Sequence, residues 1–258
     1  MELIKSVTRR SRVSELLYVV LNVGFAGLLL LLVQLFPDPW PWIAFLVVIM
    51  SKWRIFAVRP RFWIANIQTN LGDMLLGFAV VALIWLHSGQ LPLQLLITAL
   101  YVAWLVIIKP KSKRRWVVIQ AGIMHFVTLM ALLSFTYRLP AAVMVGSGWL
   151  IAYISAKHIL SAYDSEKNLM FLSMAWGVIV AQLSWLAYYW TAAYSALFLP
   201  QLAIIATLLG YLAYVCYASH ERNDGIISKQ DVVPAAVFVS MASVLLLVIF
   251  NDFGNINL

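Results

Sequence analysis

Polar side chains follow one face of an apolar segment that begins near residue 63. They are Asn66, Asn70 and Asp73, and Gly77 follows them. The spacings of 4, 3 and 4 residues place all four residues on one side of an α-helix. Asp73 is the only carboxylate well inside an apolar segment, and a charge inside a bilayer costs at least about 2.5 kcal/mol. The pattern predicts that Asp73 has a buried partner or binds a proton or cation.

His125 is the predicted partner of Asp73. Asp73 lies 12 residues after Arg61 and His125 lies 10 residues after Arg115, and both helices are expected to run in the same direction. With a rise of about 1.5 Å per residue, Asp73 is expected roughly 18 Å up its helix, with His125 at a matching depth. Three further polar side chains are expected to complete a polar core. They are Gln120, Thr128 and Gln182.

Three interpretations of this polar core stay open. In the first, it is a proton or cation relay or a pocket for a polar solute. The binding residues are then Asp73, Asn66, Asn70, His125, Gln120 and Gln182. In the second, the same side chains form a hydrogen-bonded network that only fixes helix packing. In the third, the helix enters the membrane near Leu71, which leaves Asp73 at the wet interface.

A second polar group lies at the end of the apolar segment 140–160. Lys157, Ser161 and Asp164 share a helical face by spacings of 4 and 3. Retinal proteins need a Schiff-base lysine in mid-helix, but Lys157 is too near the helix end, so we interpret it as a lysine that extends to the interface. An enzyme acting on a membrane lipid would need acidic residues near the interface. Asp164 and Glu166 are the only pair of acids at a predicted helix end.

Neither a metal ion nor another cofactor is predicted. No two histidines have the i, i+4 spacing of a helical metal or haem pair. The single cysteine, Cys216, excludes an intrachain disulfide and a thiolate metal site. The sequence contains no P-loop, dinucleotide-binding turn, nucleophile elbow or zincin motif. An enzymatic activity is therefore not favoured.

The composition shows which class of protein must position these residues. Of 258 residues, 64% are hydrophobic and 11% are charged, and the mean hydropathy is +0.91. Soluble domains are about half apolar and a quarter charged. These values exclude a water-soluble enzyme, a disordered chain and a nucleic-acid-binding domain. Because the longest polar interval is only 219–231, we expect a single transmembrane helical domain over 1–258.

Long continuous apolar runs predict membrane-spanning helices, because about 20 apolar residues cross the hydrocarbon and barrel strands would alternate. The predicted fold is all-α with about nine spans. They cover residues 14–36, 40–57, 63–87, 91–108, 116–137, 140–160, 169–190, 195–217 and 232–250. The second span is the weakest, since residues 40–50 supply only 11 residues before Lys52.

The basic residues set the predicted orientation. With nine spans and a cytoplasmic N-terminus, 17 of the 18 Lys and Arg residues lie on the cytoplasmic side and Arg138 lies outside. If the second segment does not cross, the best distribution is 13 against 5. We therefore predict nine crossings, a cytoplasmic N-terminus, an external C-terminal tail at 251–258, and a place in the plasma (inner) membrane, most simply that of a bacterium.

The loop at 109–115 predicts contact with anionic lipid. Each cation near a headgroup contributes about 1 kcal/mol, although the orientation alone also explains their presence. The cations are Lys109, Lys111, Lys113, Arg114 and Arg115. The bilayer and a membrane-protein partner are the expected contacts, and no nucleic acid is expected.

Small residues and prolines predict how the helices pack and begin. Gly146-Ser147-Gly148 predicts a close approach of two helices. All nine prolines fall at predicted span ends, and Pro92, Pro140 and Pro200 are each expected to open a helix. No broken helix of the kind found in transporters is expected.

Three stretches of the chain resemble uncharacterised multi-pass membrane proteins of small-genome, host-dependent bacteria. They are residues 51–73, 155–164 and 181–190. The resemblance covers most of the chain but implies no activity. From the residues themselves, the first hypothesis is a small-solute or ion permease with a polar midplane site. The alternative is a non-catalytic scaffold or assembly subunit that binds lipid or a protein partner.

Overall fold

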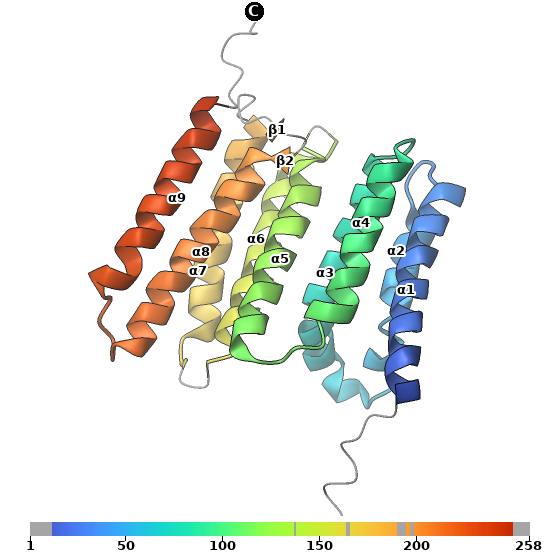
Figure 1. Ribbon diagram of the computed structural model, residues 1–258, viewed down its shortest axis with the longest axis horizontal. Helices are drawn as coiled ribbons and strands as arrows, with labels where there is room; N and C mark the ends of the chain where they lie inside the picture. Colours follow the sequence, from blue (N-terminus) through green and yellow to red (C-terminus); the bar gives the residue numbers. More distant parts are fainter. Residues whose placement is uncertain (1–11, 137, 164–165, 190–194, 197–198, 250–258) are drawn as a thin grey trace, which may run out of the picture. The chain divides into compact units, whose positions relative to one another are not determined.

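The computed structural model describes residues 12–136, 138–163, 166–189, 195–196 and 199–249. Within these ranges the chain forms nine α-helices, three 3₁₀ or π-helical turns and one pair of two-residue strands (Figure 1). Eight of the described helices are long and apolar enough to span a membrane, so the chain is a polytopic helical membrane protein. The predictions for Asp164 and for the tail 251–258 lie outside the described residues.

Within the described ranges, the elements come in the following order along the chain. They are α1 (Arg12–Leu35), α2 (Trp42–Met50), η1 (Trp53–Ile55), η2 (Pro60–Phe62), α3 (Trp63–Leu86), α4 (Leu91–Ala103), η3 (Trp104–Ile108), α5 (Arg114–Leu133), α6 (Ala141–Leu160), α7 (Leu169–Tyr189), β1 (Ser195–Ala196), β2 (Leu199–Pro200), α8 (Gln201–Arg222) and α9 (Lys229–Ile249).

These elements form two compact units. Unit 1 comprises the described parts of residues 1–67 and 80–116, and unit 2 those of residues 68–79 and 117–258. The middle of α3 therefore belongs to unit 2 and its two ends to unit 1. The single transmembrane domain over 1–258 stays a prediction, and each unit is described by itself.

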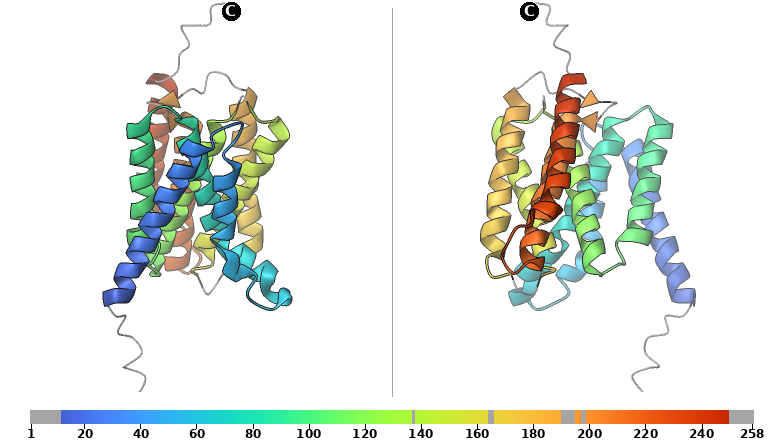
Figure 2. Two further views of the ribbon diagram at one scale, coloured as in Figure 1. Left: turned by 90° about the vertical axis from the view of Figure 1, so that its right-hand side faces the viewer. Right: turned by 60° about the vertical axis from the view of Figure 1, so that its left-hand side comes forward.

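In unit 1, α2 lies beside α1 and runs in the opposite direction (Figures 1 and 2). Its nine residues rise only about 13 Å, less than half of the hydrocarbon thickness. The helix ends at Met50, where the Ser51 hydroxyl donates to the Val48 carbonyl at 2.6 Å, and the chain continues through η1 and η2. The predicted span 40–57 is thus helical over a shorter stretch than expected.

A buried glutamine joins three helices of unit 1. The Gln94 side chain is 3% exposed; its Nε2 donates to the Ile84 carbonyl at 3.0 Å, and its Oε1 accepts from Gln34 Nε2 at 3.2 Å. Ile84 lies in the last turn of α3, where carbonyls lose their intrahelical partners. Gln94, on the neighbouring helix α4, therefore supplies a hydrogen bond to a carbonyl at the end of α3.

A second polar contact in unit 1 supplies a hydrogen bond to a carbonyl in a π-helical turn. In η3 the Lys109 amide donates to the Trp104 carbonyl at 2.9 Å, one residue further than in an α-helix. The hydroxyl of Tyr18 on α1 donates to the Leu105 carbonyl within this turn at 2.7 Å. The contact links α1 to the irregular end of α4.

Unit 2 packs α5 to α9 and the middle of α3 around a continuous apolar core. The core residues are Leu129, Leu133, Met144, Ile151, Ala152, Val180, Leu202, Ala203, Ile205 and Ala206. α9 runs beside α8 (Figures 1 and 2), and few of its residues are buried.

In unit 2, α6 and α7 pack closely against each other. A Cβ added at Gly148 would overlap Ser184 Oγ and would lie 2.9 Å from Ser184 Cβ. A Cβ added at Gly177 would lie 2.8 Å from Cδ1 of Trp149. The predicted close approach is therefore confirmed at Gly148, whereas a Cβ at Gly146 would meet nothing within 4 Å.

Two predicted helix starts were wrong. The helix predicted for 195–217 begins at Gln201, because Ser195–Ala196 pairs with Leu199–Pro200 before it, and Pro200 is its N-cap, as expected of a proline that opens a helix. Pro234 lies inside α9 rather than at its end, because α9 already begins at Lys229. Its first turn is closed there by the Asp231 amide, which donates to the Ser228 carbonyl at 3.2 Å.

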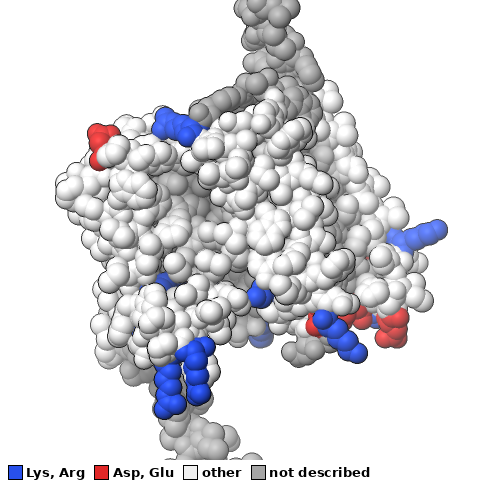
Figure 3. Space-filling view, turned by 180° about the vertical axis from the view of Figure 1, so that it is seen from behind, with Lys and Arg blue, Asp and Glu red and all other residues white. Residues whose placement is uncertain are grey.

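Apolar side chains cover the outer sides of the helices. Figure 3 shows the charged side chains in a few small groups, with broad uncharged surface between them. Leu21, Ile64 and Val248 are 67% to 70% exposed. In water such exposure would be unfavourable, but a helix side that faces lipid needs no other partner.

Candidate functional site

The middle of α3 packs tightly against α5 and α6 at Gly72. A Cβ added there would lie 2.6 Å from Met124 Sδ and 3.7 Å from Ile154 Cγ2. Asp73, His125 and Ser155 are the next residues in their respective helices. The sequence prediction that Asp73 and His125 lie at one depth therefore agrees with the packing of unit 2.

The common level of these residues lies nearer to one helix end than expected. Ile154 precedes Leu160, the last residue of α6, by six residues, which corresponds to a rise of about 9 Å. Asp73 was expected roughly 18 Å from the helix start because α3 was assumed to enter the bilayer near Phe62. The first two turns of α3 are mostly exposed, so the buried part of the helix begins later than that.

His125 is the most deeply buried ionisable residue of the predicted set. Its side chain is 4% exposed, and its Nδ1 lies 2.9 Å from Ser155 Oγ. Its Nε2 is buried and has no hydrogen-bond partner within the described part of the chain. A buried ring nitrogen without a partner is unfavourable, which makes this atom a candidate contact for a ligand.

An aromatic residue of α7 packs beside the His125 ring. The Thr128 hydroxyl does not bind the ring, because it donates to the Met124 carbonyl of its own helix at 2.5 Å. The ring centroid of Trp176 on α7 lies 6.0 Å from that of His125 at an angle of 43°. A Cβ at Gly210 on α8 would lie 3.2 Å from Trp176 Cζ2, so the indole is fixed between α5 and α8.

Asp73 lies near enough to the end of α6 for its carboxylate to interact electrostatically with the imidazole of His158. Five residues earlier on α3, Gln68 Oε1 accepts from Lys157 Nζ at 3.1 Å. The two polar groups that the sequence suggested separately, on α3 and at the end of α6, thus lie together. His158 and Ser155 are three residues apart and share a face of α6, so polar groups continue from Asp73 toward His125.

The other predicted binding residues differ in how deeply they are buried. Asn70 is half-buried, and its Nδ2 donates to Thr69 Oγ1 at 3.4 Å. Gln120 and Asn66 are also half-buried, on α5 and on the part of α3 in unit 1. Gln182 on α7 is exposed, and its place in a polar core is not supported by this burial.

Sequence reasoning missed Ser155, Trp176 and Gln68 as neighbours of this site. The i, i+3 spacing of Ser155 and His158 was the available signal, since it marks a polar face on an otherwise apolar helix. Gln68 carried no such signal, because an exposed glutamine at a helix end is common. Trp176 resembled the many aromatic residues of the membrane interfaces.

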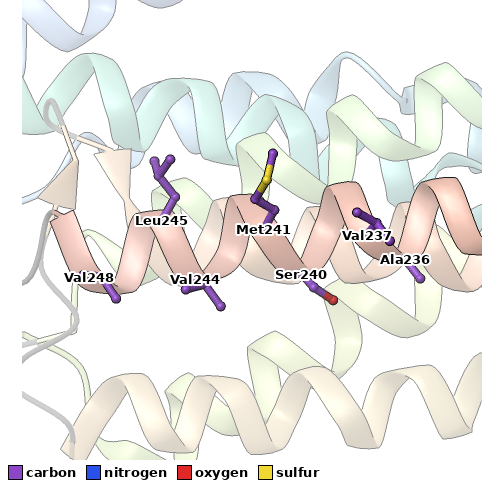
Figure 4. Close-up of a pocket in the computed structure, with 7 residues that line it drawn as sticks. All are labelled: Ala236, Val237, Ser240, Met241, Val244, Leu245 and Val248. Carbon is purple, nitrogen blue, oxygen red and sulfur yellow. The ribbon is translucent and has the colours of Figure 1, made fainter.

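The described residues offer little to a metal ion. They contain no group of three or more His, Cys, Asp or Glu side chains that could hold one. A separate depression lies along α9, and Figure 4 shows that the residues lining it all come from this one helix. They are Ala236, Val237, Ser240, Met241, Val244, Leu245 and Val248. A depression with one apolar wall resembles a lipid-facing groove rather than a solute chamber.

The fold and the site define a polytopic helical membrane protein in which a buried histidine lies close to a polar helix end. In comparisons with known proteins, no family model, no curated protein and no solved structure matched the chain.

Proposed function

We propose that the protein is a permease for a small solute or ion and that unit 2 carries its polar site. The observation that supports this most is His125, a nearly fully buried imidazole whose Nε2 lacks a partner in the described chain. Ionisable residues inside membrane helices are expensive and most often serve transport or proton transfer. A purely structural histidine would be expected to use both ring nitrogens.

The proposed path runs along α6. Asp73 and His158 form its outer part, beside the bond between Lys157 and Gln68. Ser155, one turn further along the helix, connects this part to His125. Because the outer residues are partly exposed and the inner residues are buried, polar groups extend from the helix end into unit 2. A permease needs polar groups that continue from the surface to its buried site. A network that only fixes helix packing does not need the exposed polar groups.

Replacing Asp73 with asparagine is expected to lower transport at least about tenfold or to shift its pH dependence, because the side chain keeps its volume and loses its charge. Uptake of a pooled set of small metabolites into proteoliposomes, read by mass spectrometry, measures this. Glu15→Gln removes a carboxylate from the exposed start of α1 and should leave uptake unchanged. Equal rates and pH profiles for Asp73→Asn and the native protein would contradict the role of Asp73.

We further propose nine crossings, with the N-terminus in the cytoplasm of a bacterial cell whose inner membrane holds the protein. The antiparallel course of α1 and α2 supports a second crossing, which η1 and η2 must help to complete because α2 is short. The distribution of 17 cations against one supports the orientation.

Two single cysteines test this topology, in a Cys216→Ser background. Ser112→Cys is expected to be protected from a membrane-impermeant thiol reagent on intact cells, and Asn255→Cys is expected to be labelled. Permeabilised cells supply the control, because both positions should then react. Equal protection of both positions on intact cells would indicate an even number of crossings, with the segment 40–58 returning to the side from which it came.

The second candidate function is a scaffold that binds anionic lipid or a membrane-protein partner. One observation favours it: Lys111 Nζ lies 3.6 Å from the Trp116 ring centroid, and the Arg115 guanidinium lies 5.6 Å from it. Aromatic and basic side chains combine in this way at headgroup level. The loop would use Lys109, Lys111, Lys113, Arg114 and Arg115. A stable protein partner that copurifies in mild detergent would favour the scaffold over the permease.

A further inference from the structure

The two ring nitrogens of His125 have different surroundings. Nδ1 lies 2.9 Å from Ser155 Oγ, whereas Nε2 is buried without a partner in the described part of the chain. A neutral imidazole carries one proton, so one nitrogen donates and the other accepts. The partner of Nδ1 therefore decides what Nε2 can bind.

The hydroxyl of Ser155 fixes this choice. Its Oγ lies 2.9 Å from the Ile151 carbonyl and 3.0 Å from the Ala152 carbonyl, which are acceptors only. The single hydroxyl proton therefore points to the helix backbone, as is usual for serine in a helix. The contact with His125 is then a hydrogen bond only if Nδ1 carries the proton and donates to Oγ. Nε2 is left with its lone pair.

We infer that Nε2 of His125 is the atom that accepts a hydrogen bond from the transported solute, which is consequently a neutral or cationic donor of N–H or O–H groups and not an anion. The inference rests on the proposed permease function and adds its substrate class. Asp73 lies at the same level of unit 2, so an anion would meet both a carboxylate and a lone pair. The ring of Trp176 beside His125 suits the apolar or cationic part of such a solute.

Inorganic cations fit these residues less well. Sodium, magnesium and calcium bind oxygen ligands, whereas the buried atom here is a single imidazole nitrogen. The imidazole ring contacts the Ser155 hydroxyl, at Nδ1, and the ring of Trp176. An organic donor needs only one well-placed acceptor and an apolar or aromatic wall, which is what the described residues provide.

Nitrogen-15 NMR of histidine-labelled protein in lipid bilayers tests the inference directly. His125→Asn identifies the His125 signals among the four histidines. We expect Nδ1 to be protonated and Nε2 to be bare, and we expect the Nε2 signal to move on addition of glycerol or methylammonium chloride. Sodium acetate and sodium chloride should leave it in place. A protonated Nε2, no response to either donor, or an equal response to acetate would overturn the inference.

Substitutions at Ser155 separate positioning from general packing. Ser155→Ala is expected to give a mixture of both ring tautomers and to weaken the response to the donor at least about tenfold. Ser155→Thr keeps the hydroxyl and is expected to restore the native spectrum. Ser161→Ala, on the exposed end of the same helix, should change neither reading. An unaltered tautomer in Ser155→Ala would overturn the role of Ser155.

The same samples distinguish failure of this inference from failure of the proposed function. If Nε2 responds to a donor but proteoliposomes take up none of the pooled metabolites, the binding site stands and the permease function fails. If metabolites are taken up, the permease function stands. The substrate class is then wrong if all of these metabolites are anions or if Nε2 is protonated.

Discussion

Replacing Gly148 with alanine is expected to destabilise the protein by about 1–3 kcal/mol, the usual cost of excess volume at a tight contact. The new Cβ would overlap Ser184 Oγ and lie 2.9 Å from Ser184 Cβ. Rotation of the Ser184 side chain relieves only the first of these contacts, so α6 and α7 must separate. The free energy of unfolding in mild detergent, measured by a denaturant titration, tests this.

Gly146 supplies the matched control, because it lies in the same helix and a Cβ there meets nothing within 4 Å. Gly146→Ala should be neutral or stabilising by up to about 1 kcal/mol, since alanine is the better helix former. Adding Ser184→Gly to Gly148→Ala removes both contacting atoms and should recover part of the loss. Equal effects of alanine at positions 146 and 148 would contradict the close contact of α6 and α7.

Replacing Gln94 with leucine is expected to destabilise unit 1 by about 1–3 kcal/mol, the cost of leaving a buried polar group without a partner. Ile84 is fully buried, and the Ser88 amide donates to Trp85 instead. The Ile84 carbonyl then loses the bond from Gln94 Nε2, and Gln34 loses its acceptor. Leucine has a similar volume, so packing contributes little to the change.

Thermal unfolding in micelles, followed by tryptophan fluorescence, measures the effect of Gln94→Leu. Gln182→Leu is the control, because Gln182 lies on the exposed side of α7 and should change stability by less than about 0.5 kcal/mol. A loss of the same size in both variants would mean that the amide of Gln94 is not held by the bonds to Ile84 and Gln34.

The ends of several helices follow from local features of the sequence. The predicted segments 63–87, 91–108 and 140–160 lie within one residue of the observed elements at each end, because prolines, glycines and charged residues end apolar runs at membrane boundaries. The segment 40–57 is harder to predict. Its helix stops at Met50, where a serine hydroxyl binds the last turn and basic residues follow.

The candidate site could be predicted only in part. The spacing of polar residues on α3 and the position of His125 in its helix indicated that Asp73 and His125 share a level. The neighbours of Asp73 and His125 depend on which face α6 presents to them. The observed orientation of α6 places Ser155 beside His125 and His158 near Asp73. Helix rotation is set by packing at Gly72 and Gly148, and no property of a single helix specifies it.

The sequence by itself determined the class of this protein and the approximate positions of its long helices, because the bilayer imposes length, apolarity and charge placement on every span separately. The tertiary structure alone decided that α3 divides between two units, that Gln94 satisfies the end of α3, and that Nε2 of His125 stays unpaired in the described chain. These features depend on which helix faces meet. Helices with uniformly apolar sides leave that choice to the close fit of small residues, and the small-residue pattern at 146–148 indicated a close approach without naming the partner helix.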